Sequence, residues 1–465
     1  MNVLLVSPNI ETLPDPVFPL GLAYVAAALR DNHIPYRILD LCFAEDYAVS
    51  IQTAIDDFHP DVVGLSLRNV DNVSYPNYVT YLPFYRQVIT VIREKSDATI
   101  VIGGSAVALV PDLLLNHLNA DFGVIGEGEA AFIRLIKDLD DCANIQGFPG
   151  PKIVSDASGV FLDPDTISIP DRSGFDNGAY LKWGGMGNIQ TKRGCPFKCV
   201  YCTYPLIEGN RIRVRSPKYI GDEIERMLQE GIDNLFFVDN VFNYPIDHAE
   251  AICQEIITRQ LPVKWSCYAN PKFVTRRLVE LMLAAGCTSV EFGSDAAHDA
   301  MLGNLGKNFT VDDLRNASAI CGESGMSFCH SLLLGGPGET MDTVRQTVAV
   351  ISDMSPTAVI CMVGIRVFPH TRLFHIALEE GSFGPEEDFL KPVFYLSPAI
   401  ENKILPFIEE FSKKNPTWIF PGMNINMNPG QQRTLRRFGI KGPLWEHLKK
   451  GRIGRRSQKR RSSSD

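Results

Sequence analysis

The sequence predicts an α/β protein in which a doubly wound parallel sheet is followed by a partial barrel of six strand–helix units. Short apolar runs alternate with helical patterns from the start of the chain to about residue 145, and a second series of the same kind begins at Gly187. Between the two series, residues 146–186 are rich in Gly, Pro, Asp and Ser, which is typical of a linker.

The first series contains five short apolar runs that we predict as strands, at residues 3–6, 37–40, 61–66, 99–104 and 121–125. Helical patterns separate these runs, which predicts parallel pairing in a Rossmann-like domain over residues 1–145. Ligands of such sheets bind at the carboxyl ends of the strands. The loops expected at that edge are 66–72, 103–105 and 126–129.

The second series predicts a TIM-type partial barrel, (β/α)6, over residues 187–384, with strands at 188–192, 234–238, 264–268, 289–293, 327–334 and 358–363. Six units are too few for a closed eight-fold barrel, so we expect an open one with its chemistry at the carboxyl ends of the strands. The sequence indicates two helix starts: one at Ser216, which precedes Pro217, and one at Thr310, which has an acidic residue nearby. Residues 385–448 are less regular, with a helical run at 400–412, and are expected to cover part of the site.

The composition limits the possible functions. The chain has 465 residues, 45% of them hydrophobic, and no apolar run reaches the roughly 18–20 residues of a membrane span. Residues 449–465 carry eight basic residues and one acid, which leaves 37 basic and 53 acidic residues, a net charge of −16, on the rest. We therefore expect a disordered basic tail on an acidic body that does not bind nucleic acid. Eleven cysteines without an export signal indicate a reducing, cytoplasmic location.

Three cysteines are clustered directly after the first barrel strand. Cys195, Cys199 and Cys202 form the pattern C-x3-C-x2-C, and a loop can fold three thiolates at this spacing around one metal centre. A structural zinc site needs four ligands, usually in two C-x2-C pairs, and no fourth Cys or His lies at a suitable distance. Three thiolates on a 4Fe-4S cluster leave one iron free to bind a small molecule. A zinc knuckle or three core cysteines remain the alternatives.

With Tyr201 as the aromatic residue before the third cysteine, this motif resembles the signature of the radical SAM enzymes. Segments 237–240, 290–294, 334–340 and 366–373 resemble further stretches of that family. The resemblance implies that Cys195, Cys199 and Cys202 hold a 4Fe-4S cluster and that S-adenosyl-L-methionine (SAM) binds beside it. It assigns Glu291 and Ser294 to polar groups of SAM and Asp239 to the ribose side, and it adds Tyr201, Gly335 and Pro337 to the SAM contacts. A buried salt bridge is the alternative for Glu291.

A radical SAM barrel behind a doubly wound domain resembles the cobalamin-binding subclass. The pattern D-x-H-x-x-G, whose His binds cobalt in many such domains, fails here because Asp31 and His33 are followed by Tyr36 where the glycine should stand. We therefore expect no His ligand and place the loop of Arg68 under the cobalt; a phosphate or carboxylate clamp is the alternative for Arg68. The residues assigned to cobalamin are Arg68, Asn69, Asn72, Gly103, Gly104, Ser105, Gly126, Glu127, Gly128 and Glu129.

The resemblance favours a cobalamin-dependent radical SAM C-methyltransferase that uses a 5′-deoxyadenosyl radical and methylcobalamin at an unactivated carbon. A ring rearrangement or oxidative cyclisation without methyl transfer is the alternative within the enzyme class, and a non-enzymatic cobalamin or metal sensor is the alternative outside it. The expected partners are a small-molecule or peptide substrate and a low-potential electron donor of the flavodoxin or ferredoxin type.

Overall fold

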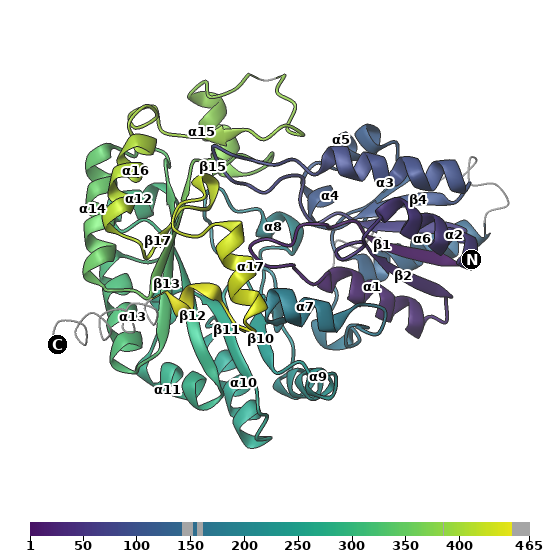
Figure 1. The fold of residues 1–465 in the computed structure, drawn as a ribbon, viewed down its shortest axis with the longest axis horizontal. Coiled ribbons are helices and arrows are strands. Elements are labelled where there is room, and N and C mark those ends of the chain that lie inside the picture. Colours follow the sequence, from purple (N-terminus) through teal and green to yellow (C-terminus); the bar gives the residue numbers. More distant parts are fainter. Residues whose placement is uncertain (142–151, 156–160, 385, 449–465) are drawn as a thin grey trace, which may run out of the picture.

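The computed structural model describes residues 1–141, 152–155, 161–384 and 386–448, and the predicted basic tail lies outside them. The chain forms two α/β units side by side, the N-terminal sheet on the right of Figure 1 and the barrel on the left. One apolar cluster of buried side chains runs continuously from the first unit into the second, for example from Leu65 to Val363. The two units therefore share a core rather than touching only at their surfaces.

The N-terminal sheet confirms the predicted strands. All its strands are parallel, in the order β2-β1-β3-β4-β5-β6. They are β1 (Val3–Ser7), β2 (Tyr36–Asp40), β3 (Val62–Ser66), β4 (Thr99–Gly103), β5 (Phe122–Val124) and β6 (Ile153–Val154). The sequence did not predict β6, which comes from the stretch interpreted as a linker.

Helices cover both faces of this sheet, as a doubly wound fold requires. α1 and α6 pack together over one face, and α2 and α3 over the other. The helices are α1 (Leu20–Asp31), α2 (Tyr47–Phe58), α3 (Leu82–Lys95), α4 (Ser105–Leu109), α5 (Pro111–Leu118) and α6 (Gly128–Asp141). Because β3 follows β1 in the sheet, the connections leave in opposite directions at the carboxyl ends of these strands and open a crevice there.

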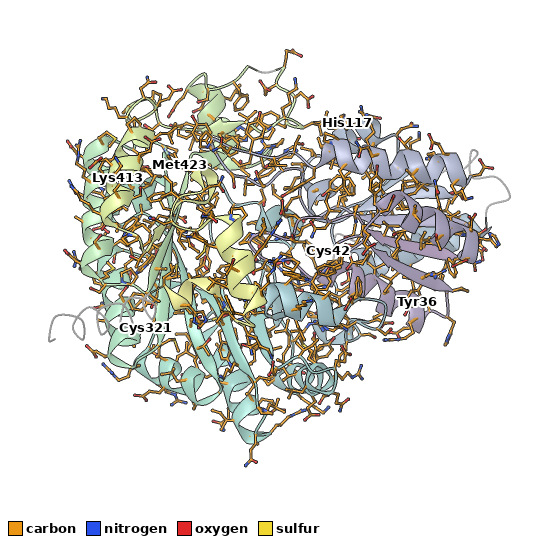
Figure 2. All side chains as sticks on the ribbon, viewed as in Figure 1. Tyr36, Cys42, His117, Cys321, Lys413 and Met423 are labelled. Carbon is orange, nitrogen blue, oxygen red and sulfur yellow. The ribbon has the colours of Figure 1, made fainter. Side chains whose placement is uncertain are left out.

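The carboxyl ends of the N-terminal strands face the barrel. In Figure 2, Tyr36 at the start of β2 lies on the outer side, and Cys42, which follows β2, lies nearer the barrel. The predicted cofactor loops of this domain are therefore aimed at the second domain.

The barrel sheet is also entirely parallel, in the order β17-β14-β13-β12-β11-β10-β7. It consists of β7 (Gly187–Ile189), β10 (Asn234–Phe237), β11 (Lys264–Ala269), β12 (Cys287–Asp295), β13 (Ser327–Leu334), β14 (Ala358–Val363) and β17 (Trp418–Ile419). β7 and β17 stand at the two edges, so the barrel is open as predicted, with β17 as an additional short strand.

The first predicted barrel strand divides into two. After β7 the chain leaves the sheet, and β8 (Lys192–Arg193) pairs antiparallel with β9 (Arg213–Val214). The physical reason is Asp239, whose carboxylate accepts hydrogen bonds from the backbone N–H groups of Thr191 at 2.7 Å and Lys192 at 3.3 Å. These amides are therefore bonded to a side chain instead of to a neighbouring strand.

The barrel strands are separated by helices that cover the outside of the sheet (Figure 1). Ser216 caps α9 and Thr310 forms a capping box at α13, which confirms both predicted helix starts. The helices are α9 (Pro217–Gln229), α10 (Ile246–Thr258), α11 (Arg276–Ala284), α12 (Asp299–Asn304), α13 (Val311–Glu323) and α14 (Met341–Asp353).

The residues after β14 pack against the barrel and close part of it. They form β15 (Ile365–Arg366), α15 (Arg372–Glu379), β16 (Phe394–Tyr395), α16 (Ile404–Lys414), α17 (Pro429–Arg437) and the short helix η5 (Leu444–His447). Leu444 and Trp445 pack against Cys329 and Ala358 of the barrel strands. Glu446 accepts hydrogen bonds from Thr288 at 3.0 Å and Ser289 at 2.5 Å near the start of β12. This segment, residues 427–448, forms the barrel floor.

Buried ion pairs join the two domains. Arg366 of β15 contacts Asp71 of the β3–α3 loop at 2.9 Å, and the two side chains are 3% and 0% exposed. Arg193 of β8 contacts Glu127 at 3.1 Å and Glu129 at 2.5 Å. Among the described residues, no helix has both the length and the apolar character of a membrane span.

Candidate cluster, nucleotide and cobalamin site

The three clustered cysteines lie on one loop between β8 and α8 (Tyr204–Ile207), at the carboxyl end of the barrel. The loop begins at Gly194, whose φ of +85° and whose approach to the carbonyl of Arg211 leave no room for a side chain. The backbone N–H of Cys195 then donates to Gly209 at 3.1 Å, and that of Cys202 donates to Cys199 at 3.2 Å. Backbone contacts thus fold all three cysteines into one compact turn.

Burial raises the pKa of all three thiols, that of Cys202 to about 12, and the charge of the neighbouring cysteine sulfurs raises the pKa of Cys195 and Cys202 further. Their sulfur atoms therefore lie close enough to interact. Among the described residues, no three Cys, His, Asp or Glu side chains are arranged around a single ion. Three soft sulfur ligands on one turn suit an iron–sulfur cluster, which is wider than one ion and leaves one iron for another ligand.

A buried hydrogen-bonded group lies against this loop, and the sequence did not predict it. Asp295, at the end of β12, accepts hydrogen bonds from the hydroxyl of Tyr201 at 2.6 Å and from the ammonium of Lys307 at 2.7 Å. The charge of Lys307 also lowers the pKa of the Cys199 thiol, against the larger effect of burial. Tyr201, predicted as a SAM contact, is thus tied to a cation beside the cluster loop.

Glu208 is a second acidic residue that sequence reasoning missed. Its carboxylate accepts hydrogen bonds from the N–H of Gly194 at 3.1 Å, from Gln190 at 3.0 Å and from Asn240 at 3.2 Å. Burial raises its pKa. It therefore holds the start of the cysteine loop against the ends of β7 and β10.

Glu291 lies on the inner face of β12, where the resemblance placed it. Its carboxylate accepts a hydrogen bond from Ser331 at 2.5 Å, Trp445 of the barrel floor lies near it, and burial raises its pKa. Beside it, Gly293 is exposed and a Cβ there would meet nothing within 4 Å. Tyr268 is 40% exposed although it lies deep in the molecule, and the charge of Glu291 raises its pKa. The inner face therefore borders open space with one carboxylate in it.

Two other predicted SAM residues do not face this space. Ser294 is fully buried, and its hydroxyl hydrogen-bonds His330 at 2.7 Å. It lies three residues from Glu291, and an odd separation puts side chains on opposite faces of a strand. Asp239 is 1% exposed, and its carboxylate is occupied by Thr191 and Lys192. In this structure Asp239 positions the chain that enters the cysteine loop, and its ribose contact stays a prediction.

The predicted turn after β13 is built around a buried carboxylate. Glu339 accepts hydrogen bonds from the N–H groups of Gly335 and Gly336, and its Oε1 has no partner among the described residues. Burial raises its pKa to about 7. Gly335 has a φ of +106°, and the carbonyl of Pro337 accepts a hydrogen bond from Asn304 at 2.9 Å. The turn is thus fixed by its own contacts at the carboxyl end of β13.

The predicted cobalamin loops of β3 and β4 pack on each other. Gly104 has a φ of +99°, and a Cβ there would lie 2.6 Å from the carbonyl oxygen of Leu67. Ser105 donates to the carbonyl of Arg68 at 2.6 Å, and Gly103 accepts from the N–H of Leu67 at 2.7 Å. The backbone of Arg68 is held in place by these contacts, while its side chain is exposed.

The other predicted residues of these loops have backbone roles. The carbonyl of Asn69 accepts a hydrogen bond from Tyr85 at 2.9 Å. The side chain of Asn72 accepts one from the N–H of Val79 at 2.9 Å, which closes the β3–α3 loop. Neither contact tests whether these residues face cobalt.

The loop after β5 joins the domains. Glu127 and Glu129 both bind Arg193, and Glu127 also accepts a hydrogen bond from Arg213 at 2.7 Å. Gly126 has a φ of +78° with open space at its Cβ position, and a Cβ on Gly128 would meet Val25 at 3.1 Å. The two carboxylates therefore hold the β8–β9 hairpin, which carries the cluster loop, against the N-terminal domain.

The predicted residues of the two domains converge. The charge of Arg68 lowers the pKa of Tyr204 and Tyr268, against the larger effects of burial and neighbouring acids. Tyr204 follows the cluster loop and is 42% exposed, and Tyr268 lies beside Glu291. Arg68 of the β3 loop, the cluster loop and the inner face of the barrel thus lie near one another, and α4 after the β4 loop packs against α8 after the cluster loop.

Comparison with known proteins supports both halves of this site. Residues 189–351 match the Radical SAM superfamily and residues 6–136 match the B12 binding domain. A tryptophan 2-C-methyltransferase of Streptomyces laurentii is 26% identical over 80% of this chain and 74% of its own length. An uncharacterized methyltransferase of Pyrococcus horikoshii is 28% identical over 75% of this chain and 77% of its own.

A solved structure extends the similarity to the whole fold. The radical S-adenosylmethionine methyltransferase TsrM of Kitasatospora setae, solved with tryptophan substrate and a SAM analog bound, superimposes with a TM-score of 0.87. The sequences are 26% identical, and the match covers 98% of this chain and 99% of that one. The domain order, the cysteine loop and these matches agree: the chain is a radical SAM enzyme with an N-terminal cobalamin-binding domain.

Proposed function

We propose that this protein is a cobalamin-dependent radical SAM C-methyltransferase that acts on a small molecule. The observation that carries the proposal is that Arg68, the cluster loop and Glu291 lie near one another where the two domains meet. A methyl group must pass from a corrin to a substrate that is activated beside the cluster, so the two cofactors must face one substrate.

When bound, the 4Fe-4S cluster with SAM supplies radical initiation, and cobalamin supplies methyl transfer. The chain's own residues hold and enclose these groups. Cys195, Cys199 and Cys202 would bind the cluster, and Glu291 is the half-buried carboxylate available to a polar group of SAM. Arg68 is exposed in the loop at the carboxyl end of β3, where its cation would lie beside a bound cobalamin.

Tryptophan is the first substrate to test, because the similar enzymes of Streptomyces and Kitasatospora act on it or bind it. The inner face of the barrel suits a flat aromatic molecule. Phe236 and Tyr268 contact each other edge to face there, with ring centroids 5.0 Å apart. Aromatic side chains favour such geometries with further aromatic rings.

The proposal includes an external partner. The cluster needs electrons at low potential, so we propose a carrier of the flavodoxin or ferredoxin type as donor, in a reducing, cytoplasmic compartment. The ten cysteines among the described residues are all free thiols, which is consistent with this proposal.

The test is anaerobic reconstitution with iron, sulfide and cobalamin, followed by reaction with methyl-labelled SAM, a reductant and tryptophan, indole derivatives or other small molecules. Label in a carbon-bound methyl group of the product supports the proposal. SAM consumption with a rearranged or cyclised product that lacks label would overturn methyl transfer in favour of the alternative chemistry. A Cys202→Ala variant is the control for adventitious methylation.

A further inference from the structure

We propose that Lys307 is a positioning residue that sets the reduction potential of the cluster through its buried positive charge beside the turn that contains Cys199. The inference rests on the proposed function only in that the three cysteines hold a 4Fe-4S cluster. It concerns a residue outside every sequence motif described above.

The backbone brings Lys307 to the cluster loop by a specific close approach. Gly306 has a φ of +71°, and a Cβ at this position would lie 2.4 Å from the carbonyl oxygen of Lys198. The N–H of Val200 donates to the carbonyl of Leu305 at 3.0 Å. The segment 305–307 therefore lies directly against the turn that contains Cys199.

The ammonium of Lys307 is held at that place by an anion on its other side. It contacts Asp295 at 2.7 Å, and the side chains of Lys307 and Asp295 are only 7% and 5% exposed. Asp295 has a φ of +62°, an uncommon conformation for this residue, and is also bonded to Tyr201. A buried, paired ammonium keeps its charge and is weakly screened by solvent.

Such a cation acts on the electron affinity of the cluster. One-electron reduction by an external low-potential reductant adds one negative charge to the cluster. A positive charge beside a ligating sulfur stabilises the reduced form and raises the potential. Asp295 opposes this effect with the smaller influence of the two, since its charge raises the pKa of Cys199 less than the charge of Lys307 lowers it.

The experiment measures the midpoint potential of the reconstituted enzyme without substrate, by a redox titration followed by electron paramagnetic resonance. Iron and sulfide analysis first establishes that each variant holds its cluster. In Lys307→Met we expect the reduced form to lose at least a factor of ten in relative stability, a downward shift of about 59 mV or more. In Asp295→Asn, which leaves the cation uncompensated, we expect a shift in the opposite direction.

Lys198→Met is the matched control, because Lys198 is next to Cys199 in sequence but exposed, and we expect its removal to leave the potential unchanged. An unshifted potential in Lys307→Met, or equal shifts in Lys307→Met and Lys198→Met, would overturn the proposal. If Lys307→Met does not hold a cluster, the direction of the potential shift in Asp295→Asn tests the proposal instead. Loss of the cluster in both variants would also overturn the proposal. Methyl transfer is not part of the readout, so failure of the proposed function is seen separately in the labelling assay.

Discussion

Replacing Arg366 with Met should destabilise the junction between the domains. The loss should exceed the loss caused by removing one partner of an exposed ion pair. Arg366 donates to Asp71 and also to the backbone carbonyls of Val367 at 2.8 Å and Phe389 at 3.0 Å. Burial lowers its pKa and the charge of Asp71 opposes that shift. The methionine side chain is unbranched and apolar, is shorter than arginine, and has no donor to replace the guanidinium.

The expected cost follows from burial. Removing one partner of a buried ion pair leaves the other charge without compensation and typically costs about 3–5 kcal/mol. Two backbone carbonyls also lose a donor, although neighbouring groups can replace part of that loss. An exposed pair such as Arg345–Asp342, 59% and 85% exposed, contributes roughly 0–1 kcal/mol. We therefore expect Arg366→Met to lower the free energy of unfolding at least about three times as much as Arg345→Met does.

The assay is urea denaturation of the two variants, Asp71→Asn and the double variant, followed by tryptophan fluorescence. If the pair acts as a unit, the double variant is less destabilised than the sum of the single variants. Because Asp71 lies three residues from Arg68, Arg366→Met should also weaken cobalamin binding, which is measured by the absorbance of the corrin. A loss below about 1 kcal/mol, the value of an exposed pair, would refute the reasoning.

Three further predictions concern the site itself. Cys202→Ala should abolish binding of about four iron atoms per chain in iron analysis, whereas Cys321→Ala, in the apolar core, should retain them. Gly104→Ala should weaken cobalamin binding about tenfold or more in spectroscopic titration, because the φ of +99° at Gly104 and the nearby carbonyl oxygen exclude a Cβ. Gly21→Ala is the control: a Cβ at Gly21 would lie in open space, so cobalamin binding should not change. The pKa of Glu339 is raised to about 7 in the folded protein, so the unfolded chain loses this proton at lower pH. The free energy of unfolding should therefore fall as pH rises from about 4.5 to 7. In denaturation experiments, Glu339→Gln should show a flatter dependence of stability on pH.

The sequence predicted the strands well where a single pattern determined them. Runs such as residues 99–103 are apolar throughout, and a buried parallel strand needs little else. β6 and β17 escaped prediction because each has only two residues, and their pairing depends on a neighbouring edge rather than on a local pattern. The division of the first barrel strand depends on Asp239, which is 47 residues from Lys192 in the sequence.

The candidate site also combines features encoded in a local stretch of sequence with contacts between distant segments. The cysteine loop is local, so its spacing alone indicates a cluster. Lys307 and Asp295 meet the loop only through tertiary contacts, and neither residue belongs to a recognisable motif. Ser294 was assigned by similarity to a segment, but the alternation of β12 turns its side chain toward His330. Local chemistry was thus predictable, and the contacts between distant segments were not.

The barrel floor has a consequence for the order in which the protein matures. Glu446 accepts hydrogen bonds from Thr288 and Ser289, so the start of β12 is completed by a residue synthesised more than 150 positions later. The N-terminal sheet, through β6, can form while the ribosome is still making the barrel. The predicted SAM site is therefore completed only after residue 446 has been synthesised.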